Sequence, residues 1–243
     1  MKIIVNGACG QMGQILCRRA EKAGHAVVWA ADKYRRDGEP RLLCDFEGEA
    51  DVVIDFSHHS SAEDLCAFAL RRRLPLVIAT TGHTEEEIAL IRSCSADIPV
   101  FYSYNMSLGA AVLADLAARA AKLFPDADIE IVEAHHNRKI DAPSGTAKII
   151  FDSIRSVLPE KTAHCGRAGM GVREKDEIGI SSLRMGGVVG VHEVYICTDN
   201  QMLTLRHEAQ SRDLFADGAL SAAAFVAGKG PGLYTMKDLA SSD

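Results

Sequence analysis

The stretch Lys2-Ile3-Ile4-Val5-Asn6-Gly7-Ala8-Cys9-Gly10-Gln11-Met12-Gly13 decides the fold. The β-branched run before Gly7 predicts a buried strand, and apolar residues recur at helical spacing from Met12 to Ala23. A glycine turn between a strand and a helix lets a pyrophosphate approach the backbone and the helix N-terminus. We therefore expect residues of this turn to bind a dinucleotide, namely Gly7, Ala8, Cys9, Gly10, Gln11 and Met12. A plain strand–turn–helix with packing glycines is the alternative.

An acidic residue follows this motif at the distance expected for a ribose contact. Asp32 ends the second expected strand, nineteen residues after Gly13. An acid at about this interval usually binds the ribose hydroxyls. Lys33 is next to it and could accept a 2′-phosphate, so both NADH and NADPH are expected cofactors. A solvated surface lysine is the alternative for Lys33.

Strand-like and helix-like stretches alternate as far as residue 105. We expect strands at 2–6, 25–31, 51–56, 76–80 and 99–102, and helices at 12–23, 60–73 and 84–95. Ser60 with Glu63, and Thr84 with Glu87, have the spacing of a capping box at the start of two of these helices. The alternation predicts an α/β fold with a parallel, doubly wound, Rossmann-like sheet.

Ligands of such a sheet bind at the carboxyl ends of its strands. Two polar segments lie there, Thr80 and Thr81 after the fourth strand and Ser103, Tyr104, Asn105 and Met106 after the fifth. We expect both segments to contact the nicotinamide end of the cofactor. Turn or helix-cap roles for the threonines and serine are the alternative.

The pattern changes after residue 105. We expect helices at 108–124, 144–158 and 213–227, strands at 129–134, 178–184, 188–197 and 202–208, and a loop at 160–177. Short polar turns between the last strands favour antiparallel pairing. The sequence thus predicts a dinucleotide-binding domain at 1–105, to which 213–243 returns, and an α+β domain at 106–212 with a mixed or antiparallel sheet.

The composition narrows the class of protein. The 243 residues carry a net charge of −6, which argues against binding to nucleic acid or to an anionic membrane. The chain has no uncharged apolar run long enough to span a bilayer, and its first apolar run is too short for a signal peptide. Seven widely spaced cysteines without a Cys-x-x-Cys pair predict neither a disulfide framework nor a zinc site. We expect a cytoplasmic protein.

The most informative segment runs from Glu133 to Thr146. His135 can act as an acid or a base near neutrality, and Lys139 offers a positive charge and a proton. Ser144 can cap the next helix, so that the N–H groups of Gly145 and Thr146 face a carboxylate or phosphate. Proton donors beside an anion site suit reduction of a carbonyl or imine that carries carboxylates. A solvated basic loop before an ordinary capped helix is the alternative. No cluster at ligand spacing predicts a metal.

These residues resemble the 4-hydroxy-tetrahydrodipicolinate reductase family, also called dihydrodipicolinate reductases. The strongest match is Glu133–Ala147, which reads E-A-H-H-x-x-K-x-D-A-P-S-G-T-A without a break. Further matches are Gly7–Gly13, Thr80–Gly82, Asn105–Ser107, Arg184 with Gly187, Phe215–Ala219 and Pro231–Tyr234. The sequence departs from the family pattern at Ala79, Ser181, Met185 and Val191.

The resemblance implies a reaction and a site. The reaction is NADH- or NADPH-dependent reduction of a cyclic dicarboxylate, 4-hydroxy-tetrahydrodipicolinate, to tetrahydrodipicolinate with loss of water, in the diaminopimelate route to lysine. The resemblance implies that His135 donates and accepts the proton, and that Lys139 is a second proton donor. The expected substrate-binding residues are His136, Ser144, Gly145 and Thr146, and the resemblance implies that His136, Gly145 and Thr146 hold the substrate carboxylates. It adds Ala79 to the dinucleotide contacts. It also implies a homotetramer assembled through the sheet of the second domain.

Two other functions fit the same residues. One is a related NAD(P)H reductase that acts on another oxo or imino acid. The other is a nicotinamide-nucleotide-binding regulator without catalysis. A regulator needs no proton donor, so the pairing of His135 with Lys139 favours an enzyme.

Overall fold

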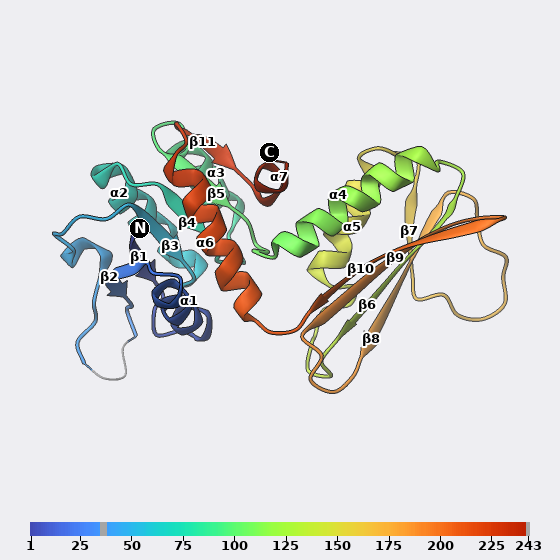
Figure 1. The fold of residues 1–243 in the computed structure, drawn as a ribbon, viewed down its shortest axis with the longest axis horizontal. Helices are drawn as coiled ribbons and strands as arrows, with labels where there is room; N and C mark the ends of the chain where they lie inside the picture. Colours follow the sequence, from blue (N-terminus) through green and yellow to red (C-terminus); the bar gives the residue numbers. More distant parts are fainter. Residues whose placement is uncertain (35–37, 242–243) are drawn as a thin grey trace. The chain divides into compact units, whose positions relative to one another are not determined.

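The computed structural model describes residues 1–34 and 38–241, and the chain divides into two compact units. The first unit contains Met1–Leu108 and Arg212–Asp243, and the second contains Gly109–Ser211 (Figure 1). The C-terminal segment of the chain thus belongs to the same unit as its N-terminal segment. Of the range 213–243, residues 242 and 243 lie outside the described part.

The first unit is built on a six-stranded parallel sheet. Its strands are β1 Lys2–Asn6, β2 Ala26–Ala31, β3 Val52–Asp55, β4 Leu76–Ile78, β5 Pro99–Tyr102 and β11 Gly232–Tyr234, in the order β11-β5-β4-β3-β1-β2. All four residues of β3 are buried, as expected of a strand covered on both faces. The chain starts at β1 and continues to β2 on one side and to β3 on the other. The predicted Rossmann-like sheet is confirmed, and its switch point lies beside β1.

The described residues of this unit form five α-helices. They are α1 Gln11–Lys22, α2 Ala62–Arg72, α3 Glu85–Cys94, α6 Asp213–Ala227 and α7 Met236–Ala240. Helix α6 packs on β3, β4 and β5 and on α1 (Figure 1). A Cβ atom at Gly218 of α6 would lie 1.7 Å from the carbonyl oxygen of Met106, so only glycine allows this close approach. Arg19 of α1 donates two hydrogen bonds of 2.7 Å to Asp217.

Two local predictions in this unit had different outcomes. The capping box at Thr84 and Glu87 is confirmed, because each side chain accepts the backbone N–H of the other residue. The capping box at Ser60 and Glu63 was wrong. His59–Ser61 forms a short 3₁₀ turn and α2 begins only at Ala62, while the Ser60 hydroxyl lies 3.0 Å from the ring of His58.

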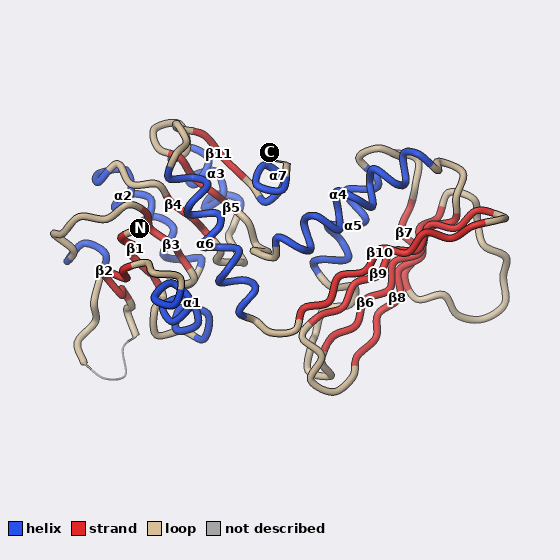
Figure 2. Tube along the Cα trace, in the orientation of Figure 1, coloured by secondary structure: helices blue, strands red, loops and turns tan. Residues whose placement is uncertain are grey.

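The second unit has a mixed five-stranded sheet covered on one face by two helices (Figure 2). The strands are β6 Asp128–His135, β7 Thr162–Cys165, β8 Glu177–Arg184, β9 Gly190–Thr198 and β10 Gln201–Ala209, in the order β10-β9-β6-β8-β7. The helices are α4 Leu108–Leu123 and α5 Gly145–Arg155. The first residue of α4 belongs to the first unit. β6 pairs with β8 in parallel and with β9 antiparallel. The predicted mixed sheet is confirmed.

The prediction of a continuous loop at 160–177 was wrong, because Thr162–Cys165 pairs in parallel with β8. All four residues of β7 are exposed, so no alternation of apolar and polar residues marks this strand. Strands β8 and β9 are neighbours in the chain but not in the sheet, because β6 lies between them.

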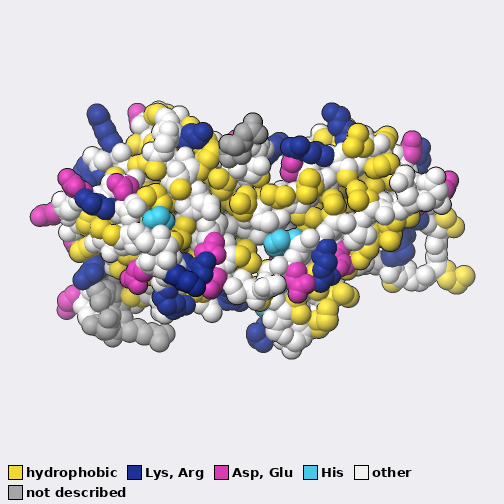
Figure 3. Space-filling model, in the orientation of Figure 1, with side chains coloured by type: hydrophobic (Ala, Val, Ile, Leu, Met, Phe, Trp, Pro, Cys, Tyr) yellow, Lys and Arg dark blue, Asp and Glu magenta, His cyan; other side chains and the backbone are white. Residues whose placement is uncertain are grey.

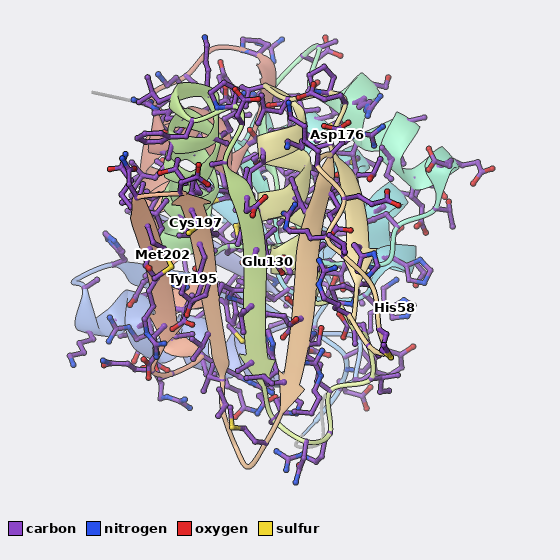
Figure 4. All side chains as sticks on the ribbon, turned by 90° about the vertical axis from the view of Figure 1, so that its right-hand side faces the viewer. His58, Glu130, Asp176, Tyr195, Cys197 and Met202 are labelled. Atoms are coloured by element: carbon purple, nitrogen blue, oxygen red, sulfur yellow. The ribbon has the colours of Figure 1, made fainter. Side chains whose placement is uncertain are left out.

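The core of the second unit lies between the helices and one face of the sheet. Ile129 and Ile131 of β6 and Ile150 and Ile154 of α5 are fully buried there. Glu130, Tyr195, Cys197 and Met202 lie on the opposite face, which neither helix covers (Figure 4). Figure 3 also shows apolar side chains along the outer surface of α4, where Val112 and Leu116 are exposed.

No helix within residues 1–34 and 38–241 has both the length and the apolar character to cross a membrane.

Candidate functional site

The glycine turn after β1 is as tight as the sequence predicts. Gly7 has a φ angle of +80°, and a Cβ atom there would lie 2.5 Å from the carbonyl oxygen of Phe56. A Cβ atom at Gly13 would lie 2.0 Å from the carbonyl oxygen of Gly7. Helix α1 begins at Gln11, and its N-cap residue Gly10 provides no side-chain cap. The turn therefore brings uncapped backbone N–H groups and the positive helix end together, as a pyrophosphate requires.

Asp32 lies beside this turn at the end of β2. Its carboxylate accepts the N–H of Cys9 and the N–H of Tyr34, each at 2.8 Å. A carboxylate oxygen can accept more than one hydrogen bond, so both oxygens can still accept ribose hydroxyls. The Lys33 ammonium lies 2.9 Å from Asp64, and both side chains are at least half exposed.

A buried carboxyl group that the sequence analysis missed connects three strand ends. Asp55, the last residue of β3, is 1% exposed. It accepts hydrogen bonds from Asn6 (2.7 Å), Ser57 (2.6 Å) and Thr80 (2.6 Å). Burial raises the pKa of Asp55, and these hydrogen bonds oppose the shift. The Thr80 hydroxyl therefore holds the strand ends in place.

The remaining predicted dinucleotide contacts lie after β4 and β5. Ala79 is buried and Thr81 is exposed. Ser103 donates its hydroxyl to the carbonyl of Asn105 at 2.8 Å, and the Asn105 side chain accepts the N–H of Ser107 at 2.9 Å. Met106 is buried, whereas Tyr104 is exposed. The turns that follow β4 and β5 are thus held by hydrogen bonds and buried side chains, while the side chains of Thr81 and Tyr104 are exposed to solvent.

In the second unit, His135 is the last residue of β6 and is bonded to a buried carboxylate. Its Nδ1 lies 2.6 Å from Oε2 of Glu133, which is fully buried. Glu133 also accepts two bonds from Arg184 (2.9 and 2.7 Å) and one from the N–H of Ser144 (3.2 Å). Burial alone would raise the pKa of Glu133, but the hydrogen bonds from His135 and Arg184 outweigh it and hold this pKa well below its ordinary value.

The ionised Glu133 sets the tautomer of His135. A carboxylate only accepts hydrogen bonds, so Nδ1 of His135 carries a hydrogen and donates it. Nε2 is therefore the ring nitrogen that can take up or release a proton at the site.

Lys139 belongs to the same polar network. Its ammonium donates to Asp141 at 2.7 Å, and Arg184 donates to the carbonyl oxygen of Asp141 at 2.6 Å. The hydrogen bond from Lys139 is the main cause of a lowered pKa at Asp141. The carbonyl of His136 accepts the N–H of Lys139 at 3.1 Å. Arg184 thus connects the surroundings of both residues expected to transfer protons.

Ser144 begins helix α5 as predicted. Its hydroxyl oxygen accepts the N–H of Ala147 at 3.2 Å and lies 3.0 Å from Nε2 of His192. Gly145, the first residue of the helix, is exposed, and a Cβ atom there would meet open space. The N-terminal turn of α5, with Gly145 and Thr146, is therefore accessible to an anion.

Two residues of this network, Glu133 and His192, have no role in the sequence analysis, although the sequence carries a signal for both. For Arg184 the sequence allows a cation near the substrate, with a β-turn as the favoured alternative. Glu133 continues the inward-facing positions of β6 that contain Ile129 and Ile131, and His192 continues those of β9 that contain Val194 and Ile196. A charged or polar residue at a core position predicts a buried partner.

Replacing Gly190 by alanine is expected to lower turnover by about tenfold while dinucleotide affinity stays unchanged. A Cβ atom at Gly190 would lie 3.1 Å from Nε2 of His135, so the methyl group would crowd the nitrogen that we expect to exchange a proton. Steady-state kinetics and a dinucleotide titration measure the two effects. Gly187→Ala, at a position where a Cβ atom meets open space, is the matched control. Equal turnover of the two variants would show that the open space beside Nε2 of His135 is not needed for the reaction.

Within the part of the chain that the structure describes, no group of three or more His, Cys, Asp or Glu side chains is placed to hold a metal ion.

Comparisons with known proteins place these features in one family. Residues 1–106 match the family model of the dihydrodipicolinate reductase N-terminus, and residues 109–240 match that of its C-terminus. The chain is similar to 4-hydroxy-tetrahydrodipicolinate reductases of Caldanaerobacter subterraneus (46% identical over 245 residues, 98% of both chains) and Alkaliphilus oremlandii (43% over 242 residues, 98% of both chains).

A solved structure agrees with the sequence matches. A dipicolinate-bound dihydrodipicolinate reductase from Paenisporosarcina sp. TG-14 superposes with a TM-score of 0.75 at 25% identity, over 97% of both chains. The resemblance read from the segment Glu133–Ala147 is confirmed. The chain belongs to the dihydrodipicolinate reductase family.

Proposed function

We propose that this chain reduces 4-hydroxy-tetrahydrodipicolinate to tetrahydrodipicolinate with loss of water, using NADH or NADPH, in the diaminopimelate route to lysine. The observation that carries the proposal is the pairing of His135 with the buried carboxylate of Glu133, in a network that also holds Ser144 at the N-terminus of α5. Relatives that are 43–46% identical over nearly the whole chain have this activity in their names.

The first unit has the residues that a nicotinamide dinucleotide requires. The turn Gly7–Met12 would bind the pyrophosphate through the backbone N–H groups at the uncapped start of α1, and Asp32 would accept the ribose hydroxyls. Thr81, Ser103, Tyr104 and Asn105 lie at the carboxyl ends of β4 and β5, where the nicotinamide end would bind. The reduced cofactor, when bound, supplies the hydride.

The second unit supplies substrate binding and the proton. The N–H groups of Gly145 and Thr146 would bind one carboxylate of the substrate, with His136 beside it. The 4-hydroxyl group of the substrate would leave as water, which leaves a double bond in the ring. When the hydride adds to that double bond, His135 would release a proton from Nε2 to the ring and complete the reduction, while Glu133 stabilises the charged imidazole that gives up this proton. Lys139 is the second proton donor, and Asp141 holds its ammonium in place.

The assembly and the location are part of the same proposal. The sheet face of Tyr195 and Met202, which α4 and α5 leave open, would join four copies into a homotetramer (Figure 4). Light scattering should then give four times the mass of one chain, and a single-chain mass would contradict the tetramer. We place the enzyme in the cytoplasm, where reduced dinucleotides and amino-acid precursors are available.

Loss of NADPH absorbance tests the proposal directly. Purified protein is mixed with the condensation product of pyruvate and aspartate semialdehyde, and with aspartate semialdehyde or simple 2-oxo acids alone. Turnover on the condensation product only is the expected result. Faster turnover on another oxo acid would favour a related reductase, and dinucleotide binding without any turnover would favour a regulator.

Replacing Lys33 by alanine is expected to weaken NADPH binding by about tenfold and NADH binding by less than about twofold, as for loss of a bond between charged groups. The ion pair of Lys33 with Asp64 is exposed and therefore weak, so the ammonium can turn to a 2′-phosphate. Fluorescence titration of the free protein measures both affinities. Asp64→Asn is the control and should not weaken NADPH binding. Equal losses for both cofactors would show that Lys33 is a bystander.

A further inference from the structure

A buried histidine outside the matched segment contacts both the substrate-binding helix end and the proton donor. His192 lies on β9 and is 3% exposed. Its Nε2 is 3.0 Å from the hydroxyl oxygen of Ser144. Its ring packs edge-on against the ring of His135, with centroids 5.2 Å apart and an interplanar angle of 72°. Any role of His192 must therefore act through Ser144 or His135.

His192 carries a single ring hydrogen at neutral pH. Burial, followed by the charge of His135, lowers the pKa of His192 to about 3. The ring is therefore neutral, and the hydrogen is on Nδ1 or on Nε2. Within the described residues, Nδ1 of His192 is buried and has no hydrogen-bond partner. A buried N–H without an acceptor is rarer in proteins than a buried acceptor without a donor. The hydrogen therefore belongs on Nε2, which donates to Ser144.

This tautomer fixes the direction of the Ser144 hydroxyl. Its oxygen then accepts two hydrogen bonds, from Nε2 of His192 and from the N–H of Ala147. A hydroxyl oxygen has two lone pairs, so both are occupied and the hydroxyl hydrogen remains to be donated. Ser144 immediately precedes Gly145 and Thr146, whose N–H groups belong to the accessible first turn of α5.

We infer that His192 is a positioning residue which directs the hydroxyl hydrogen of Ser144 toward the substrate carboxylate at the N-terminus of α5. The inference rests on the proposed function, since it concerns the carboxylate that the same helix end would bind. The neutral donor His192 keeps Ser144 from turning its hydrogen inward. A carboxylate then receives a charge-assisted O–H bond in addition to the backbone N–H groups.

Two amide variants separate this role from mere packing. In His192→Gln, the amide nitrogen can occupy the place of Nε2 and donate to Ser144. In His192→Asn, the amide nitrogen occupies the place of Nδ1 and therefore cannot donate to Ser144. We expect the Asn variant to raise the KM for substrate and the Kd for dipicolinate by about tenfold, as for loss of one bond to a charged group. The Gln variant should stay within about threefold of the wild type in both quantities, while kcat changes less than KM in either variant. Calorimetry with dipicolinate measures binding without turnover.

The partner residue and a matched control complete the test. Adding His192→Asn to Ser144→Ala should cause no further loss of substrate affinity. His192 acts only through the Ser144 hydroxyl, which the alanine variant already lacks. His207→Gln alters a half-buried imidazole on β10, opposite His192. Within the described residues no hydrogen bond joins it to Ser144, so this variant should leave KM unchanged. The apparent pKa values of the kcat profile should not move in the His192 variants.

Three results would overturn the inference: equal KM values for the Gln and Asn variants, additive losses in the double variant, or a shifted pH profile. A wild-type protein without turnover would instead reject the proposed function. In that case the dipicolinate affinities of the Gln and Asn variants still decide whether His192 positions Ser144.

Discussion

Replacing His135 by glutamine is expected to lower turnover by about a hundredfold or more, as for loss of an acid–base group. The glutamine amide can occupy the place of Nε2, but it has no nitrogen that exchanges a proton near neutrality. Dinucleotide affinity should stay the same, because the glycine turn and Asp32 belong to the other unit. Steady-state kinetics with NADPH and a fluorescence titration of the free variant measure the two quantities.

A neighbouring exposed residue provides the control for this experiment. Asn137 lies two residues further along the same segment, and its backbone N–H donates to the carbonyl of Gly186. Asn137→Ala keeps that backbone bond and should keep full turnover. If His135→Gln turned over substrate as fast as the wild type, the proton would have to come from another group, with Lys139 as the next candidate.

The fold was predictable where strands are long enough to show a hydrophobic pattern. The run Val52-Val53-Ile54 identified β3 because a strand buried on both faces is continuously apolar. Two strands had no such signal. β7 is exposed at all four positions, and β11 has only three residues, so backbone pairing with β8 and β5 alone defines them. Such pairing depends on tertiary contacts that no local pattern contains.

The sequence groups candidate site residues but does not give their connections. His135, Lys139 and Ser144 lie in one continuous segment, so the sequence alone suggests a common site for them. The partners of Glu133 could not be predicted from the sequence. Arg184 is 51 residues away and contacts Glu133 only because of the parallel register of β6 and β8. Likewise, the bond between Ser144 and His192 spans 48 residues. The spacing of residues in a sequence does not encode a strand register of this kind.

The second large effect is expected from Glu133→Gln, which should lower turnover by about 10⁴-fold, as when the carboxylate behind a catalytic histidine becomes an amide. A glutamine amide can donate to Nδ1 of His135, which then carries no hydrogen. The hydrogen moves to Nε2, and this nitrogen can no longer accept a proton. Kinetics at several pH values measure the loss, which should persist across the range because the tautomer, rather than a titration, is altered.

Stability should change in the same variant. Arg184 donates two hydrogen bonds to Glu133, whose side chain is fully buried, while that of Arg184 is 19% exposed. Removing the charge of Glu133 should therefore cost about 3 kcal/mol, the lower end of the range for breaking a buried pair. The folded pKa of Glu133 lies below its ordinary value of 4.5, so its contribution to stability is complete above about pH 4.5 and is lost as the pH falls through the folded pKa. The wild type should therefore lose stability on acidification more steeply than the variant, as urea unfolding at pH 3 to 7 would measure.

A double variant separates the two effects of this substitution. Glu133→Gln/Arg184→Met removes both charges of the pair, so it should recover much of the lost stability, because no unpaired buried charge remains. Turnover should not recover, since nothing in the double variant returns the hydrogen of His135 to Nδ1. If turnover rose with stability, the carboxylate would serve only to hold β6 and β8 together. A stable but inactive double variant would instead show that Glu133 acts by fixing the tautomer of His135, since packing and charge balance have then been restored without the reaction.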